Sequence, residues 1–136
     1  MEVFPFFSEL VAFTLLFCNY YSCCHLYILL VFCSYTLRDG LVTIEKLRKL
    51  KEIISQSAAC YVDILDNDSI DKQERVVEEL SQAQLVLVLM SPDLKKSAWV
   101  KEEYRIANEK NIPILEININ HINDIQRVLS NYEKVN

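Results

Sequence analysis

Glycine is almost absent from this sequence, since Gly40 is the single glycine among 136 residues. Loops that cradle phosphates need several glycines within a few positions, because only glycine lets the backbone approach a phosphate closely. Neither the G-x-G-x-x-G loop of a Rossmann dehydrogenase nor the loop of a P-loop enzyme can be built here. Both enzyme classes are therefore excluded.

Histidine is nearly as scarce, with only His25 and His121. Both are poorly placed for a catalytic crevice, so a Ser-His or Cys-His nucleophile is disfavoured. The number of cysteines is odd, which favours a reducing compartment over a disulfide framework; they stand at positions 18, 23, 24, 33 and 60. Adjacent Cys23 and Cys24 rarely close one tetrahedral site, and no second ligand pair follows at zinc spacing, so we expect no metal site.

Basic residues are too few and too scattered to bind nucleic acid. The net charge is -5, and the 14 Lys and Arg residues form no stripe. Because a nucleic-acid binder needs a basic patch, we expect no nucleic-acid partner. The length allows one domain with a single core.

Charge is also nearly missing from the first quarter of the chain. Residues 3–33 contain one carboxylate, Glu9, and no Lys or Arg. Such a run is long enough to cross a bilayer, which takes about 20 mainly apolar residues. It lacks the positively charged start and the clear cleavage site of a secretory signal. Basic residues follow only from Arg38 onward, so a true span would leave the remainder as a cytoplasmic domain.

We therefore divide the chain into an apolar segment, residues 1–25, and a folded domain, residues 26–136. The segment is interpreted as a membrane anchor that contacts lipid through residues 3–24. Two alternatives stay open for it, a helix docked on the domain and a wrongly assigned start codon.

From residue 26 onward, predicted strands alternate with predicted helices. Continuous apolar runs, typical of strands buried on both faces of a parallel sheet, occupy residues 26–32, 59–65, 84–90 and 112–117. Apolar residues at helical spacing between and after them predict helices that begin after Thr43, after the polar loop 66–71, at 97 and at 123 or 124. The first helix has the apolar stripe Ile44, Leu47, Leu50, Ile53 and Ile54, and the second has Val76, Val77, Leu80 and Ala83.

This alternation predicts an open α/β fold. We expect a parallel sheet of four to five strands with helices on both faces, and we assume the flavodoxin-like strand order 2-1-3-4. Ligands bind such sheets beyond the carboxyl ends of the strands, where the strand order reverses. The crevice is then expected between the loops after strands 1 and 3, residues 33–40 and 91–99.

Two adjacent glutamates in the third helix are not equivalent. At about 100° per residue, the buried face of this helix is marked by Val100, Tyr104 and Ala107. Glu103 lies at the margin of that face, beside its i,i+4 neighbour Trp99, whereas Glu102 points to solvent. A half-buried carboxylate is costly unless it is paired. It indicates either a functional site or a structural salt bridge or capping contact.

Four segments, in this order and spacing, resemble the Toll/interleukin-1 receptor (TIR) domain. They are an apolar strand with a following Ser-Tyr pair and Asp, residues 32–39, then YVDIL, LVLVLMSPDLKKSAWVKEEYRIA and NIPILEI. The Ser-x-Trp segment of the family, with a glutamate four residues after the tryptophan, corresponds to Ser97, Trp99 and Glu103. The resemblance covers residues 26–117.

The resemblance implies a flavodoxin-like fold and, as in many bacterial and plant members, cleavage of NAD+ at the nicotinamide-ribose bond in immune or antiviral defence. It implies that Glu103 is the catalytic residue, and that the substrate is bound by Ser34, Tyr35, Thr36, Asp63, Ser91 and Trp99. NAD+ would be the substrate, with no cofactor. Contacts between TIR domains would make the protein a homo-oligomer.

Some positions depart from the family pattern. Thr36 replaces the usual arginine, and only about 19 residues follow the fourth strand, so we expect the fifth strand of the family to be missing or reduced. Two other functions are compatible with these residues. A non-enzymatic TIR adaptor would assemble through loop 66–71 and the helix after it. A nucleoside deoxyribosyltransferase-like enzyme would use Glu103 as a covalent nucleophile.

Overall fold

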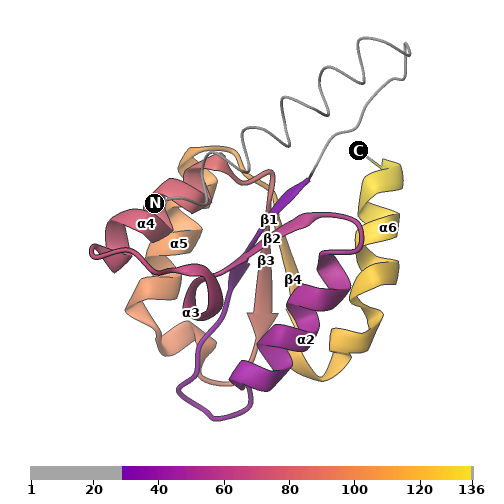
Figure 1. Cartoon of the computed structure of the whole chain (residues 1–136), viewed down its shortest axis with the longest axis horizontal. Coiled ribbons are helices and arrows are strands. Elements are labelled where there is room, and N and C mark those ends of the chain that lie inside the picture. The colour runs from indigo at the N-terminus through magenta and orange to yellow at the C-terminus, as the bar shows by residue number, and fades with distance from the viewer. Residues whose placement is uncertain (1–28, 136) are drawn as a thin grey trace.

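A computed structural model describes residues 29–135 of the chain (Figure 1). The predicted membrane anchor, residues 3–24, lies outside the described residues. Within residues 29–135, no helix is long and apolar enough to cross a membrane.

Four parallel strands form a single sheet in the order β2-β1-β3-β4, which confirms the predicted flavodoxin-like arrangement. The strands are β1 (Leu30–Ser34), β2 (Ala59–Val62), β3 (Leu85–Met90) and β4 (Ile114–Asn118). Strands β1 and β3 each have a partner on both sides, and nearly all of their side chains are buried. Their continuous apolar sequence follows from this central position, because both faces of the sheet are covered.

Helices cover both faces of the sheet (Figure 1). Helices α2 (Ile44–Ile54) and α6 (Ile125–Val135) pack on one face, and α4 (Lys72–Gln82) and α5 (Ala98–Glu109) pack on the other. Side chains of β1 alternate between the two cores, with Val31 and Cys33 facing α2 and Phe32 facing α4 and α5. Short helices complete the chain: α3 (Asp63–Asp66), η1 (Leu94–Lys96) and η2 (Ile119–Asp124).

Polar side chains fix where three helices begin. Thr43 accepts the backbone N–H of Lys46 at 3.2 Å ahead of α2, and Ser97 accepts that of Val100 at 3.3 Å ahead of α5. Asp71 caps α4 in the same way. Such caps satisfy N–H groups that have no partner inside the helix. The helix starts predicted after Thr43 and near residue 97 are confirmed.

Two predicted strand ends were wrong. The first strand was expected to end at residue 32, but it continues to Ser34, because Cys33 pairs with Val62 and Ser34 with Val88. The second strand was expected to reach residue 65. It ends at Val62, whose N–H is bonded by the Asp66 carboxylate at 2.7 Å, and the chain turns into α3.

Two apolar stripes were predicted too wide. Ile44 and Val77 were expected in buried stripes, but 43% and 37% of their surfaces are exposed. Each lies roughly a quarter turn around its helix from the centre of the residues that are buried.

Leu50 and Ile44 therefore contribute differently to stability, although both belong to the predicted stripe of α2. Leu50 is fully buried, so we expect Leu50→Ala to lower the free energy of unfolding by about 2–5 kcal/mol. Ile44→Ala should cost less than about 1 kcal/mol. Urea unfolding followed by circular dichroism measures both values, and equal losses would contradict the placement of the two side chains.

Candidate functional site

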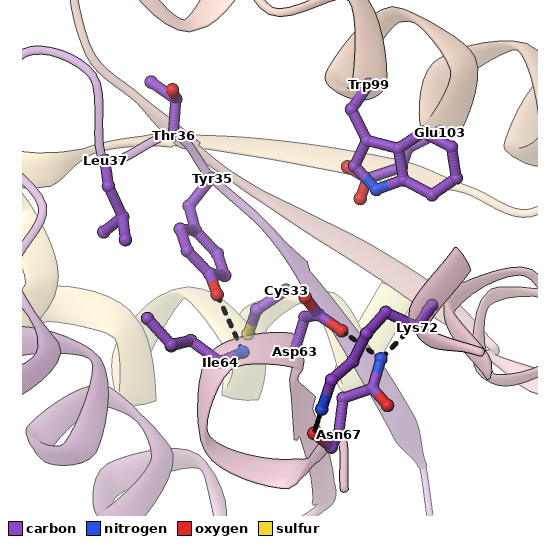
Figure 2. Close-up of a pocket in the computed structure, with 10 residues that line it drawn as sticks. All are labelled: Cys33, Tyr35, Thr36, Leu37, Asp63, Ile64, Asn67, Lys72, Trp99 and Glu103. Carbon is purple, nitrogen blue, oxygen red and sulfur yellow. Dashed lines mark hydrogen bonds between the residues drawn. The ribbon is translucent and has the colours of Figure 1, made fainter. Parts of the chain in front are cut away.

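A cavity of about 460 Å³ opens beyond the carboxyl ends of β1 and β2, against helix α5 (Figure 2). Its size is in the range of small-molecule sites, roughly 300–1,000 Å³. The lining residues are Cys33, Tyr35, Thr36, Leu37, Asp63, Ile64, Asn67, Lys72, Trp99 and Glu103. This is the edge of a parallel sheet at which ligands bind.

The position of the cavity agrees with the predicted crevice only in part. As expected, the loop after β1 forms one wall. The other wall was expected from residues 91–99, but Trp99 alone of these lines the cavity. Helix α3 and the loop after it form the other wall instead, because β2 ends early and the chain after it turns toward the cavity.

Glu103 is the deepest acidic group of the site. Only 6% of its surface is exposed, and its carboxylate accepts a hydrogen bond from Oγ of Ser34 at the end of β1. The neighbouring Glu102 has a side chain that is 39% exposed and pairs with Arg105. The different orientations predicted for the two glutamates are confirmed.

The protonation of Glu103 is governed by its burial. Among the ion pairs of residues 29–135, none involves Glu103. A structural salt bridge therefore does not account for the carboxylate. Burial, joined by the negative charge of Asp63, raises the pKa of Glu103 to about 7, although the hydrogen bond from Ser34 opposes the rise. Near neutral pH the group exchanges its proton readily, as functional carboxyl groups often do.

Asp63 forms a second acidic position in the cavity wall. Its Oδ1 accepts hydrogen bonds from the hydroxyl of Tyr61 at 3.1 Å and from the amide of Asn67 at 2.7 Å. The Tyr61 ring is stacked on Phe32 with 5.5 Å between centroids. Burial, followed by the charge of Asp63, raises the pKa of Tyr61 far above its usual range, so its hydroxyl stays a donor. The carboxylate of Asp63 is thus held by two neutral donors.

Tyr35 ties the loop after β1 to helix α3. Its hydroxyl accepts the backbone N–H of Ile64 at 3.0 Å, a contact drawn in Figure 2. Burial raises the pKa of Tyr35 to about 12, so the phenol stays neutral. Tyr35 thereby fixes the separation of two cavity walls that come from different strands.

Trp99 and Glu103 come from the first turns of α5. They are four positions apart in the sequence, and both side chains extend toward the cavity in Figure 2. Ser97 caps this helix and so sets which side chains of its first turns face the cavity. An indole ring and a buried carboxylate are therefore presented to one ligand.

Five of the predicted site residues line the cavity: Tyr35, Thr36, Asp63, Trp99 and Glu103. Ser34 does not line it and acts on it through Glu103. Ser91 lies apart from the cavity. Its Oγ is buried without a well-formed hydrogen bond. The Ser91 hydroxyl is nevertheless close to the carboxylate of Asp39, and this contact is the main reason that the pKa of Asp39 is lowered. Asp39 also accepts the N–H of Asp93 at 3.1 Å, which joins the loops after β1 and β3.

Lys72 and Ile64 line the cavity but were not predicted from the sequence. Lys72 is the first residue of α4, directly after the capping residue Asp71. That cap was the available signal, because a residue at the start of a helix after β2 lies near the end of the sheet that binds ligands.

Comparison with known families adds to the geometry. The model of the family described as "Thoeris protein ThsB, TIR-like domain" matches residues 32–124, more than half of the chain. All ten lining residues of the cavity lie within the matched segment. No curated protein matches the chain significantly.

The raised pKa of Glu103 predicts a pH-dependent stability. The unfolded chain releases this proton near the ordinary value of 4.5, whereas the folded chain keeps it to about 7. The stabilisation is therefore full below pH 4.5 and is lost as the pH rises through 7, by up to roughly 3 kcal/mol. In Glu103→Gln this loss should disappear.

Urea unfolding between pH 4.5 and 8 measures the effect. Glu102→Gln is the matched control and should follow the wild type in this window. Parallel pH dependences of the wild type and Glu103→Gln would contradict the buried, protonated state of Glu103.

Proposed function

The chain belongs to the TIR-like domain family of the Thoeris protein ThsB, and on this premise we propose that it is an NAD+ nucleosidase that acts in defence signalling. The bond cleaved is the one between nicotinamide and ribose. One observation carries the proposal: the buried Glu103 carboxylate, bonded to Ser34, faces a cavity that it shares with Trp99.

The reaction suits a site with one deeply buried carboxylate. Glycosidases usually need one carboxylic acid to protonate a poor leaving group and a second carboxylate to support the sugar cation. Nicotinamide in NAD+ is already cationic, so it leaves as a neutral molecule when the C–N bond breaks and takes the bonding electron pair with it. No general acid is required, and one ionised carboxylate suffices.

Glu103 would act in its ionised form. Positive charge develops on the ribose as the bond breaks, and a fixed, buried carboxylate stabilises it more strongly than water does. Because its pKa is about 7, a substantial fraction of Glu103 is ionised at neutral pH. A cationic nicotinamide ring near the carboxylate would favour ionisation further.

The other lining residues would orient the substrate. The indole of Trp99 offers a flat surface for the cationic nicotinamide ring. The carboxylate of Asp63, held by Tyr61 and Asn67, would accept hydrogen bonds from ribose hydroxyls. Capture of the sugar cation by water, with loss of a proton, gives ADP-ribose, and capture by the adenine of the same substrate gives a cyclic isomer.

Assembly of several copies through TIR–TIR contacts is a second function that one observation favours. Ile70, in the loop before α4, is fully exposed, and Val77 on α4 is 37% exposed. Both lie in the segment that the adaptor hypothesis assigns to assembly, and an apolar patch there would favour contact with another protein surface. This assembly would accompany catalysis in an enzyme, or replace it in an adaptor.

The enzyme is tested by release of nicotinamide from NAD+ at pH 8, where Glu103 is ionised, at high protein concentration so that assembled forms are present. Glu103→Gln should lower kcat by roughly 100-fold or more, because a fixed charge at the transition state is lost. Glu102→Gln, the matched control, should stay within about twofold of the wild type, since Glu102 lies on the exposed side of α5. Equal release by wild type and Glu103→Gln would contradict the role of Glu103. No release by the wild type would leave the adaptor and the deoxyribosyltransferase-like enzyme as the remaining functions.

A further inference from the structure

The cavity that holds Glu103 carries charges of both signs. Its charged lining residues are the carboxylates of Asp63 and Glu103 and the ammonium of Lys72. Lys72 begins α4, whereas Glu103 lies on α5, so the cation and the buried carboxylate project from different helices (Figure 2). A ligand that fits this wall carries positive charge near Glu103 and negative charge near Lys72.

No carboxylate of the described residues neutralises the charge of Lys72. Among the ion pairs of residues 29–135, none involves Lys72. Its Nζ donates to the neutral backbone carbonyl of Asn67. An ammonium group has three donors, so this bond leaves two for a ligand. Lysine in this state is suited to bind phosphate oxygens.

Asn67 fixes the ammonium relative to the acidic part of the cavity. Its side-chain amide donates to Asp63 at 2.7 Å and to the backbone carbonyl of Lys72 at 2.9 Å. Its own backbone carbonyl accepts the Nζ of Lys72. One residue therefore sets the positions of both a carboxylate and a cation, as Figure 2 shows. The spacing between them is built into the loop before α4.

We propose that Lys72 binds the pyrophosphate of a dinucleotide substrate, so that the cavity selects pyrophosphate-bearing nucleotides over nucleosides with the same cationic base. This inference rests on the proposed cleavage of NAD+, because that reaction places the cationic nicotinamide ribose beside Glu103. The pyrophosphate then extends along the wall toward Lys72. Lys72 is a specificity-determining residue that contacts the substrate away from the bond that breaks.

The test compares two substrates that differ in the pyrophosphate. Nicotinamide release is measured with NAD+ and with nicotinamide riboside, for the wild type, Lys72→Gln and Lys72→Arg. Lys72→Gln should raise KM for NAD+ roughly tenfold, the effect of losing one charged hydrogen bond. It should leave KM for nicotinamide riboside within about twofold, and Lys72→Arg should restore most of the affinity for NAD+. Lys101→Gln is the matched control, because Lys101 is exposed on α5 and does not line the cavity.

Binding of ADP-ribose, measured by calorimetry, separates this inference from the proposed function. Weaker binding of ADP-ribose by Lys72→Gln, with unchanged binding by Lys101→Gln, supports the role of Lys72. This holds even if the wild type releases no nicotinamide, because that result would overturn only the cleavage of NAD+. An equal effect of Lys72→Gln on NAD+ and nicotinamide riboside, or no effect on either, overturns the role of Lys72 and leaves the cleavage standing. Failure of the wild type to bind ADP-ribose overturns it as well.

Discussion

The hydrogen bond from Ser34 to Glu103 joins the central strand β1 to helix α5, and the chemistry of the cavity depends on it. Ser34 is held in place by the sheet, since its neighbour Cys33 pairs with β2 while Ser34 pairs with β3. The other partner is held by the helix, whose start is capped by Ser97. A neutral hydroxyl satisfies the buried carboxylate without supplying positive charge. Burial therefore prevails and the pKa rises.

The strand order places the remaining groups around this bond. Because β1 lies between β2 and β3, the loop after β1 meets α3 on one side and α5 on the other. Tyr35 and Asp63 come from the ends of β1 and β2, and Trp99 comes from the helix after β3. Parallel strands bring these segments to one edge of the sheet, although they are far apart in the sequence. The fold thus supplies a rigid frame, and the site depends on few side chains.

Sequence periodicity was sufficient for the parts of the structure that follow from one element at a time. The alternation of apolar runs and stripes predicted a parallel sheet with helices on both faces, whereas the strand order was assumed from flavodoxin-like folds. Helical geometry separated Glu103 from Glu102. Sequence periodicity could not predict the contacts between elements. The extension of β1 to Ser34 depends on partners in β2 and β3. The position of Lys72 depends on the early end of β2, which Asp66 causes by bonding the N–H of Val62.

The most direct test of this account is a titration of the Glu103 side-chain carboxyl carbon by NMR, in the free protein and with a non-cleavable carbocyclic analogue of NAD+. We predict a midpoint near pH 7 in the free protein. We also predict that the midpoint shifts to lower pH on binding, because the cationic nicotinamide ring favours the ionised carboxylate. A free midpoint near the ordinary value of 4.5, or a midpoint that saturating analogue leaves unchanged, would contradict it.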